Sequence, residues 1–201
     1  MVNNLKNRFL HLIVALILLV VVFSLPSFFE GNTVNLKEFN TQLNAKEKLA
    51  TEMLEQLVAH SESELLHSFS KKYLNADKNQ GISFFIVEGD KTTFWTTRNI
   101  PFTNSTTSFN KNNGIILLKN GWYQYLVIKK NQKKYLALIL IQKQSPINNK
   151  YFKNVFHPSF NIDVVAEITT YEGGNEVYSI NNNFLFSIYN IYYILMDLYF
   201  I

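Results

Sequence analysis

The sequence predicts an α+β protein in which an N-terminal transmembrane helix is followed by a long helix that packs on an antiparallel sheet. Three observations support this fold class: an apolar run near the N-terminus, a long stretch without Gly or Pro, and a series of short β-rich runs separated by turn residues. The chain has 201 residues, of which 47% are hydrophobic. That size allows one domain plus an anchor, because larger chains are needed for two sizeable cores.

Residues 9–29 form the predicted transmembrane helix, after a cytoplasmic N-terminus at residues 1–8. The run is almost wholly apolar and has about the 20 residues that a helix needs to cross a bilayer. Lys6 and Arg8 precede it, so the positive-inside rule places the main domain outside the cytoplasmic membrane, in the periplasm. A cleaved secretory signal would share the basic start, but the sequence after the run lacks a small-residue cleavage pattern.

Residues 36–76 are expected to form one long extracytoplasmic helix. Asn35 fits the cap position and Glu38 fits the reciprocal third position. The stretch is about 60 Å long at a rise of roughly 1.5 Å per residue. Its membrane-proximal half is expected to pack against a second copy in a homodimer, and its distal half on the sheet. Two shorter helices, broken near residues 60–63, are the alternative. The apolar stripe consists of Phe39, Leu43, Ala50, Leu54, Leu57, Leu65, Phe69 and Tyr73.

Residues 81–188 are expected to form the antiparallel sheet domain, with at least five strands in a meander. A Gly/Asp turn at residues 88–91 and an Asn-Gly turn at residues 119–121 each separate two β-rich runs, which is typical of hairpins. The run Tyr135–Ile141 is apolar on both faces and is therefore predicted to lie centrally under the helix.

The C-terminal third predicts shorter elements. A short helix is expected at residues 148–156, and strands at residues 164–168, 176–180 and 184–188. Residues 189–201 form a hydrophobic tail or an incomplete second span. The stretch from 184 onward contains Asn190 and Asp197, which makes it marginal as a membrane helix.

Composition excludes several function classes. Cysteine is absent, so the chain has no disulfide, thiolate metal site or cysteine nucleophile. The net charge is only +4 and the lysines are dispersed, whereas a nucleic-acid surface needs clustered cations. The four histidines are scattered, and no catalytic set or Gly-rich phosphate loop is visible. We therefore expect no metal, no cofactor, no nucleic acid and no enzymatic activity on this chain.

Four residues are candidates for contact with a sensed ligand. Trp95, Trp122 and Tyr125 could supply apolar walls, and Arg98 could pair with an anionic group. The alternative is that the two tryptophans belong to the core and that Arg98 is solvated.

The order of these segments resembles the extracytoplasmic sensor region of membrane histidine kinases of the Bacteroidetes type, with a PAS- or Cache-like sheet. The resemblance covers roughly residues 36–187 and lacks the kinase domains. It is carried by Phe94-Trp95-Thr96-Thr97-Arg98-Asn99-Ile100-Pro101, Asn120-Gly121-Trp122-Tyr123, Leu138-Ile139-Leu140-Ile141, residues 147–154, Glu176-Val177-Tyr178 and residues 183–187.

This resemblance implies the signal-input module of a two-component system, from a truncated or partial sensor kinase or a stand-alone module. An unknown small molecule or protein would be the stimulus, and the lipid bilayer would be a partner. The alternative is a binding or scaffold protein of the cell envelope without signalling output.

Overall fold

The computed structural model describes residues 11, 13–17, 19–20, 34–60, 73–74, 76–100, 109, 111–145, 154–162 and 166–190. The chain divides into two compact units, residues 1–33 and 34–201. The described residues of the first unit are helical. Within the described residues, no helix is both long and apolar enough to cross a bilayer, so the predicted span at residues 9–29 is not confirmed.

Helix α2 (Leu36–His60) begins at the predicted cap. Glu38 N donates to Asn35 Oδ1, and Asn35 Nδ2 donates back to Glu38 Oε2, each at 3.2 Å. The first of these bonds satisfies a backbone donor that the first turn leaves open, and the second holds the two side chains together. Residues 61–72 lie outside the described part, and helical residues occur again at 73–74 and 76–80. The choice between one long helix and two therefore stays a prediction.

The larger sheet is antiparallel and contains β1 (Ile82–Glu88), β2 (Lys91–Trp95), β3 (Asn113–Leu118), β4 (Gly121–Lys130), β5 (Lys133–Lys143) and β6 (Val155–Phe156). Its order is β2-β1-β5-β4-β3, and the short strand β6 pairs with the C-terminal end of β5. The predicted hairpins β1–β2 and β3–β4 are confirmed. The predicted simple meander is wrong, because β1 pairs with β5. As predicted, β5 is central, which gives this doubly apolar strand a neighbour on each side.

A second antiparallel sheet was not anticipated, because residues 81–188 were expected to build one sheet. It has the order β7-β9-β8, formed by β7 (Ala166–Thr169), β8 (Asn175–Tyr178) and β9 (Phe184–Asn190). The tail expected at residues 189–201 therefore begins inside β9, and its other residues are outside the described part. The described end of the predicted helix 148–156 is strand β6, followed by a 3₁₀ turn, η3 (Pro158–Phe160).

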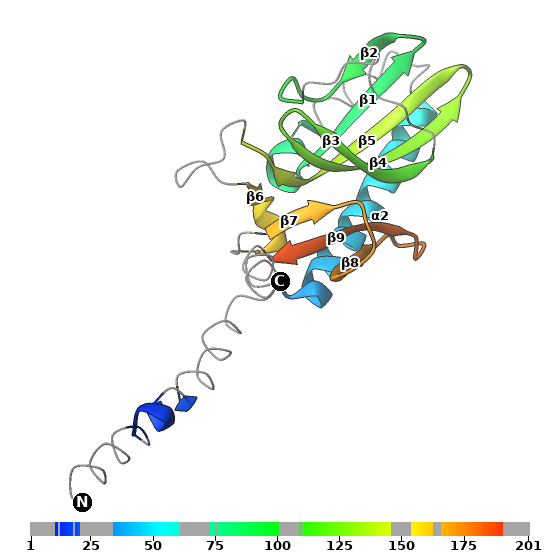
Figure 1. The fold of residues 1–201 in the computed structure, drawn as a ribbon. Helices are drawn as coiled ribbons and strands as arrows, with labels where there is room; N and C mark the ends of the chain where they lie inside the picture. Colours follow the sequence, from blue (N-terminus) through cyan, green and yellow to red (C-terminus); the bar gives the residue numbers. More distant parts are fainter. Residues whose placement is uncertain are drawn as a thin grey trace, which may run out of the picture. The chain divides into compact units, whose positions relative to one another are not determined.

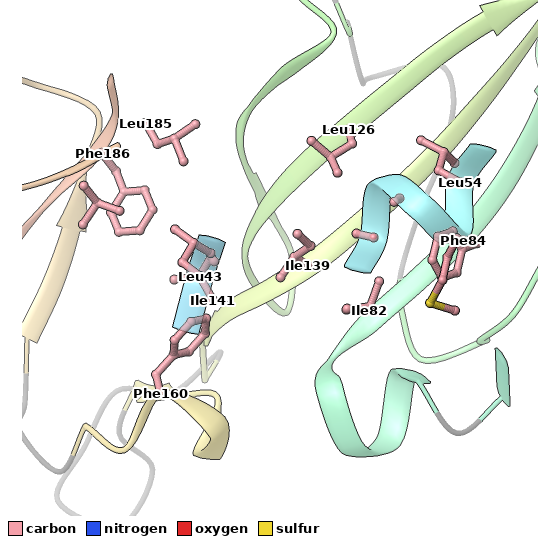
Figure 2. Packing of buried hydrophobic residues seen from close by; sticks show 14 of the residues in the cluster. Leu43, Leu54, Ile82, Phe84, Leu126, Ile139, Ile141, Phe160, Leu185 and Phe186 are labelled. Atoms are coloured by element: carbon pink, nitrogen blue, oxygen red, sulfur yellow. The ribbon is translucent and has the colours of Figure 1, made fainter. Parts of the chain in front are cut away.

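Helix α2 lies along both sheets and joins them through one core (Figure 1). It packs against β5 and β4 of the larger sheet and against β8 of the smaller one. Figure 2 shows Leu54 near the larger sheet and Leu43 near Phe186 of β9 and Phe160 of η3. Phe39 is fully buried, with its ring stacked on Phe160 at 4.5 Å.

The burial of the helix's N-terminal half has a consequence for assembly. The apolar stripe from Phe39 to Leu43 is covered by the smaller sheet and η3, so it is not available to a second copy. The outward face of α2 carries mainly charged and polar residues. The prediction of a homodimer through this helix relied on an exposed apolar stripe, and this part of the stripe is buried. The homodimer remains a prediction.

The opposite face of the larger sheet has its own core. There, side chains of β1, β4 and β5 pack with Ile100 and Phe109 from the segment between β2 and β3. Alternate residues of β5 serve the two cores: Leu138 belongs to this one, and Ile139 to the one under α2. The side chains alternate between the two cores because successive residues of a pleated strand point to opposite faces of the sheet.

Candidate functional site

Two of the predicted ligand residues lie together at the edge of the larger sheet. Trp95 ends β2, and Arg98 follows it three residues later. Both line a shallow hollow of about 230 Å³ together with Phe85, Thr97 and other residues. The indole of Trp95 is 46% exposed, so it is not a core side chain.

The other two predicted residues lie elsewhere. Trp122 and Tyr125 are on β4, which is separated from β2 by β5 and β1. Trp122 is half-buried against the core under α2, whereas Tyr125 is buried on the opposite face, 5.0 Å from the ring of Phe109. The four residues therefore do not form one site, although Tyr125 also lines the larger of two hollows described below.

A cluster of buried polar contacts centres on Glu47 in the middle of α2. Its side chain is 2% exposed and accepts hydrogen bonds from three uncharged donors. Asn113 Nδ2 of β3 donates at 2.7 Å, Gln124 Nε2 of β4 at 2.9 Å, and the backbone N of Ile180 at 3.1 Å. Ile180 lies in the turn between β8 and β9. One carboxylate thus ties the helix to both sheets, and such charge-assisted bonds are stronger than neutral ones.

Gln124 extends this network inside the larger sheet. Its Nε2 also lies 3.1 Å from Asn113 Oδ1, so the two amides that contact Glu47 contact each other. Gln124 Oε1 is buried and has no hydrogen-bond partner among the described residues. Buried amides in a network hold each other in one orientation, which makes Glu47's position well defined.

Two adjoining hollows open beside Glu47, between β3–β4 and the turn that connects β8 to β9. The smaller, about 360 Å³, is lined by Glu47, Asn113 and Ile180 among others. The larger, about 740 Å³, extends along β3 toward β9. Both are lined by Asn112, Asn113 and Asn181, so they share one wall.

Lys46, the residue before Glu47, is also buried, with 3% of its surface exposed. Its Nζ donates to the backbone oxygen of Gln80 and lies 5.4 Å from the centre of the Phe160 ring. Burial lowers the pKa of Lys46 to about 8. The ammonium of Lys46 thus connects α2 to two other segments: the last of the helical residues before β1, and η3.

His157 lies near this lysine, next to the backbone at Gly81. Its Nδ1 is 2.8 Å from Ser159 Oγ and accepts a bond from Ser159 N at 3.3 Å. Burial, followed by the positive charges of Lys46 and Lys143, lowers the pKa of His157 to about 4, against the opposing effect of Asp77. The imidazole is neutral at pH 7 and acts as a cap for η3.

Sequence reasoning missed Lys46 and Glu47, although a signal for them was present. The apolar stripe of α2 runs from Leu43 to Ala50 with a gap of seven positions, and Lys46 and Glu47 occupy the places where the stripe should continue. Charged residues at buried positions are rare and need specific partners. Their partners lie far along the chain, in the helical residues before β1, in η3, in β3 and β4 and in the β8–β9 turn. The pattern alone therefore marks the two residues but does not identify what they bind.

The arrangement is suited to binding and to mechanical coupling. Within the described residues, no group of three side chains is placed to hold a metal ion. The polar groups beside Glu47 include amides, a backbone N–H group, a hydroxyl and the charged side chains of Lys48 and Glu52, and amides and hydroxyls recognise hydrogen-bonding ligands. Searches for similar proteins find no matching family model, no matching curated protein and no matching solved structure.

Proposed function

We propose that this chain is the signal-input module of a two-component membrane sensor, anchored by residues 9–29 with its main domain outside the cytoplasmic membrane. The observation that carries the proposal is the position of Glu47, which binds donors of both sheets from one point on α2. A stimulus that displaces one sheet relative to the other must stretch or break bonds to this carboxylate. The strain then acts on the helix, whose N-terminal end follows the proposed anchor.

The construction of the domain supports this role. Both sheets share the core under α2, so they cannot move independently of the helix. Among the described residues, polar contacts between the two sheets include the hydrogen bond from Gln142 Nε2 to Ala166 O at 2.8 Å. Packed interfaces shift between discrete arrangements and do not deform continuously, which suits a switch.

The coupling can be measured by distance spectroscopy between two spin labels on the full-length chain. Because the chain has no cysteine, Asp90→Cys and Tyr171→Cys give unique labels, one on the β1–β2 turn and one beyond β7. We expect Glu47→Ala to broaden or shift the distance distribution. Glu55→Ala removes an exposed glutamate of the same helix that lines neither hollow, so it is the control and should leave the distribution unchanged. Equal distributions for both variants would contradict the relay.

Anchoring and output need separate tests. Alkaline carbonate should leave the full-length chain in the membrane fraction, and removal of residues 1–33 should release it. Protease added outside the cytoplasmic membrane should reach Tyr171, which is 79% exposed.

The nucleotide sequence on either side of the reading frame should encode a kinase-like segment. Without such a segment, stable capture of one envelope partner would favour the alternative, a scaffold protein.

A further inference from the structure

The groove formed by the two hollows beside Glu47 has the chemistry of a carbohydrate site. Four asparagines, Asn112, Asn113, Asn181 and Asn183, contribute to the lining of the larger hollow. A carboxamide carries both a donor and an acceptor on one planar group. Such groups match neighbouring sugar hydroxyls, each of which also donates and accepts.

The charges around the larger hollow disfavour an ionic ligand. Among the described residues that line it, Lys111 is the only charged one, and it is exposed at the rim. An anionic ligand is usually bound by an arginine fork or by several cations, and a cationic one by carboxylates. Neither arrangement is present along this lining. The smaller hollow is lined by Glu47, whose carboxylate already accepts three hydrogen bonds, and by Lys48 and Glu52, which have opposite charges. Charges of both signs thus occur in the groove, and its hydrogen-bonding groups favour an uncharged ligand.

The groove also offers apolar surface and a suitable size. Ile115 of β3 and Phe184 of β9 line it from opposite sheets, and they can cover the C–H faces of a sugar ring. The volume of about 740 Å³ falls in the range of roughly 300–1,000 Å³ that is common for small-ligand sites. One or two sugar rings fit such a space.

We propose that this groove binds an uncharged mono- or disaccharide between the two sheets, with Asn181 and Asn183 as its main hydrogen-bonding side chains. The inference rests on the proposed sensor function and supplies its stimulus. Asn113 lines both hollows and donates to Glu47, and Ile180 N, the donor from the smaller sheet, borders the smaller hollow. A sugar that hydrogen-bonds Asn113 and Asn181 therefore bridges the two sheets next to the carboxylate that couples them.

The test is a titration of the full-length chain in detergent, monitored by calorimetry and by the thermal unfolding midpoint. The probes are maltose, cellobiose and N-acetylglucosamine, compared with galacturonate, glutamate and glycine at the same millimolar concentrations. We expect at least one neutral sugar to bind and to raise the midpoint. Binding of only the charged probes, or of none, would overturn the assignment.

Matched variants locate the site. Asn181→Ala and Asn183→Ala should each weaken sugar binding about 10-fold, the equivalent of roughly 1.4 kcal/mol, without a large change in the unliganded unfolding midpoint. Asn99→Ala removes the same side chain at an exposed position outside the groove and should bind normally. Unchanged affinity in both groove variants would show that the sugar binds elsewhere and would overturn the assignment.

The same samples separate this inference from the proposed function. Sugar binding that leaves the distance between labels at positions 90 and 171 unchanged would support the site but contradict the relay. If none of the sugars binds the unmodified chain but Glu47→Ala still changes the distance between the labels, the site is contradicted and the relay is supported.

Discussion

Glu47 and Gln124 are 77 positions apart in the chain, yet Gln124 Nε2 donates a 2.9 Å hydrogen bond to Glu47 Oε2 inside the core. The contact joins the middle of α2 to the fourth strand of the larger sheet. A buried carboxylate is costly unless it is hydrogen-bonded, and here a second amide and a backbone N–H also donate to it. Folding of the helix, the larger sheet and the β8–β9 turn is therefore linked at one residue.

Replacement of Glu47 should strongly destabilise the protein. Glu47→Ala leaves the amides of Asn113 and Gln124 and the N–H of Ile180 without their acceptor. We expect the free energy of unfolding to fall by about 2–4 kcal/mol, measured by urea denaturation. Glu52→Ala on the exposed side of the helix should change it by less than about 0.5 kcal/mol. Similar losses in both variants would contradict the role assigned to Glu47.

The burial of Lys46 should make stability depend on pH in the alkaline range. The pKa of its ammonium is lowered from 10.5 to about 8 on folding, so the unfolded chain holds more protons between these values. The contribution of Lys46 to stability should therefore rise as pH increases from about 8 to 10.5, by at most about 1.4 kcal/mol per pH unit.

Lys46→Met keeps the length of the side chain and removes this titration. Urea denaturation of both proteins at several pH values should show a difference in unfolding free energy that changes in this window and is constant below it. A difference that is constant throughout would contradict the lowered pKa. Tyrosine titrations occur in both proteins and cancel in the comparison.

The packing of Phe39 predicts a large effect from a single truncation. Its ring is fully buried, stacked on Phe160 and in edge contact with Phe156 and Phe186. Phe39→Ala should cost about 3–5 kcal/mol of unfolding free energy. Leu49→Ala, at a position that is 38% exposed on the same helix, should cost less than about 1 kcal/mol. If the Phe39 cost were no larger than the Leu49 cost, this end of α2 would not pack on the smaller sheet.

The two tryptophans should differ in their access to solvent. Trp95 is 46% exposed at the sheet edge, whereas Trp122 is half-buried against the core under α2. In the Trp122→Phe variant the remaining fluorescence should be quenched efficiently by acrylamide, and in Trp95→Phe it should be quenched less. Equal quenching constants would contradict the separate placement of the two residues.

The local elements were predictable because their signals are local. Asn35 and Glu38 mark the start of α2, and the Gly/Asp and Asn-Gly turns mark two hairpins. The two-sided apolar pattern of β5 predicted its central place correctly. The division of the strands into two sheets was missed, because alternation within a strand shows which face is buried but not which strand it pairs with.

The candidate ligand residues show the same limit. The sequence favoured aromatic residues and Arg98 because of their chemistry, but β1 and β5 separate the strands that carry them, and of the four only Tyr125 lines the larger hollow. The groove asparagines were not selected, since asparagine in this chain is common and usually indicates a turn. Their convergence depends on the β8–β9 turn meeting the end of β3 beside Glu47.

The sequence by itself determined the α+β class, the start and buried face of α2, the two hairpins and the central strand. These features follow from spacing along the chain, which is 3.6 residues per turn in a helix and two in a strand. Tertiary structure alone decided that β1 pairs with β5, that a separate sheet covers Phe39, and that Glu47 lies where both sheets meet the helix. Those outcomes depend on contacts between residues far apart in the chain, whose energies no local pattern contains.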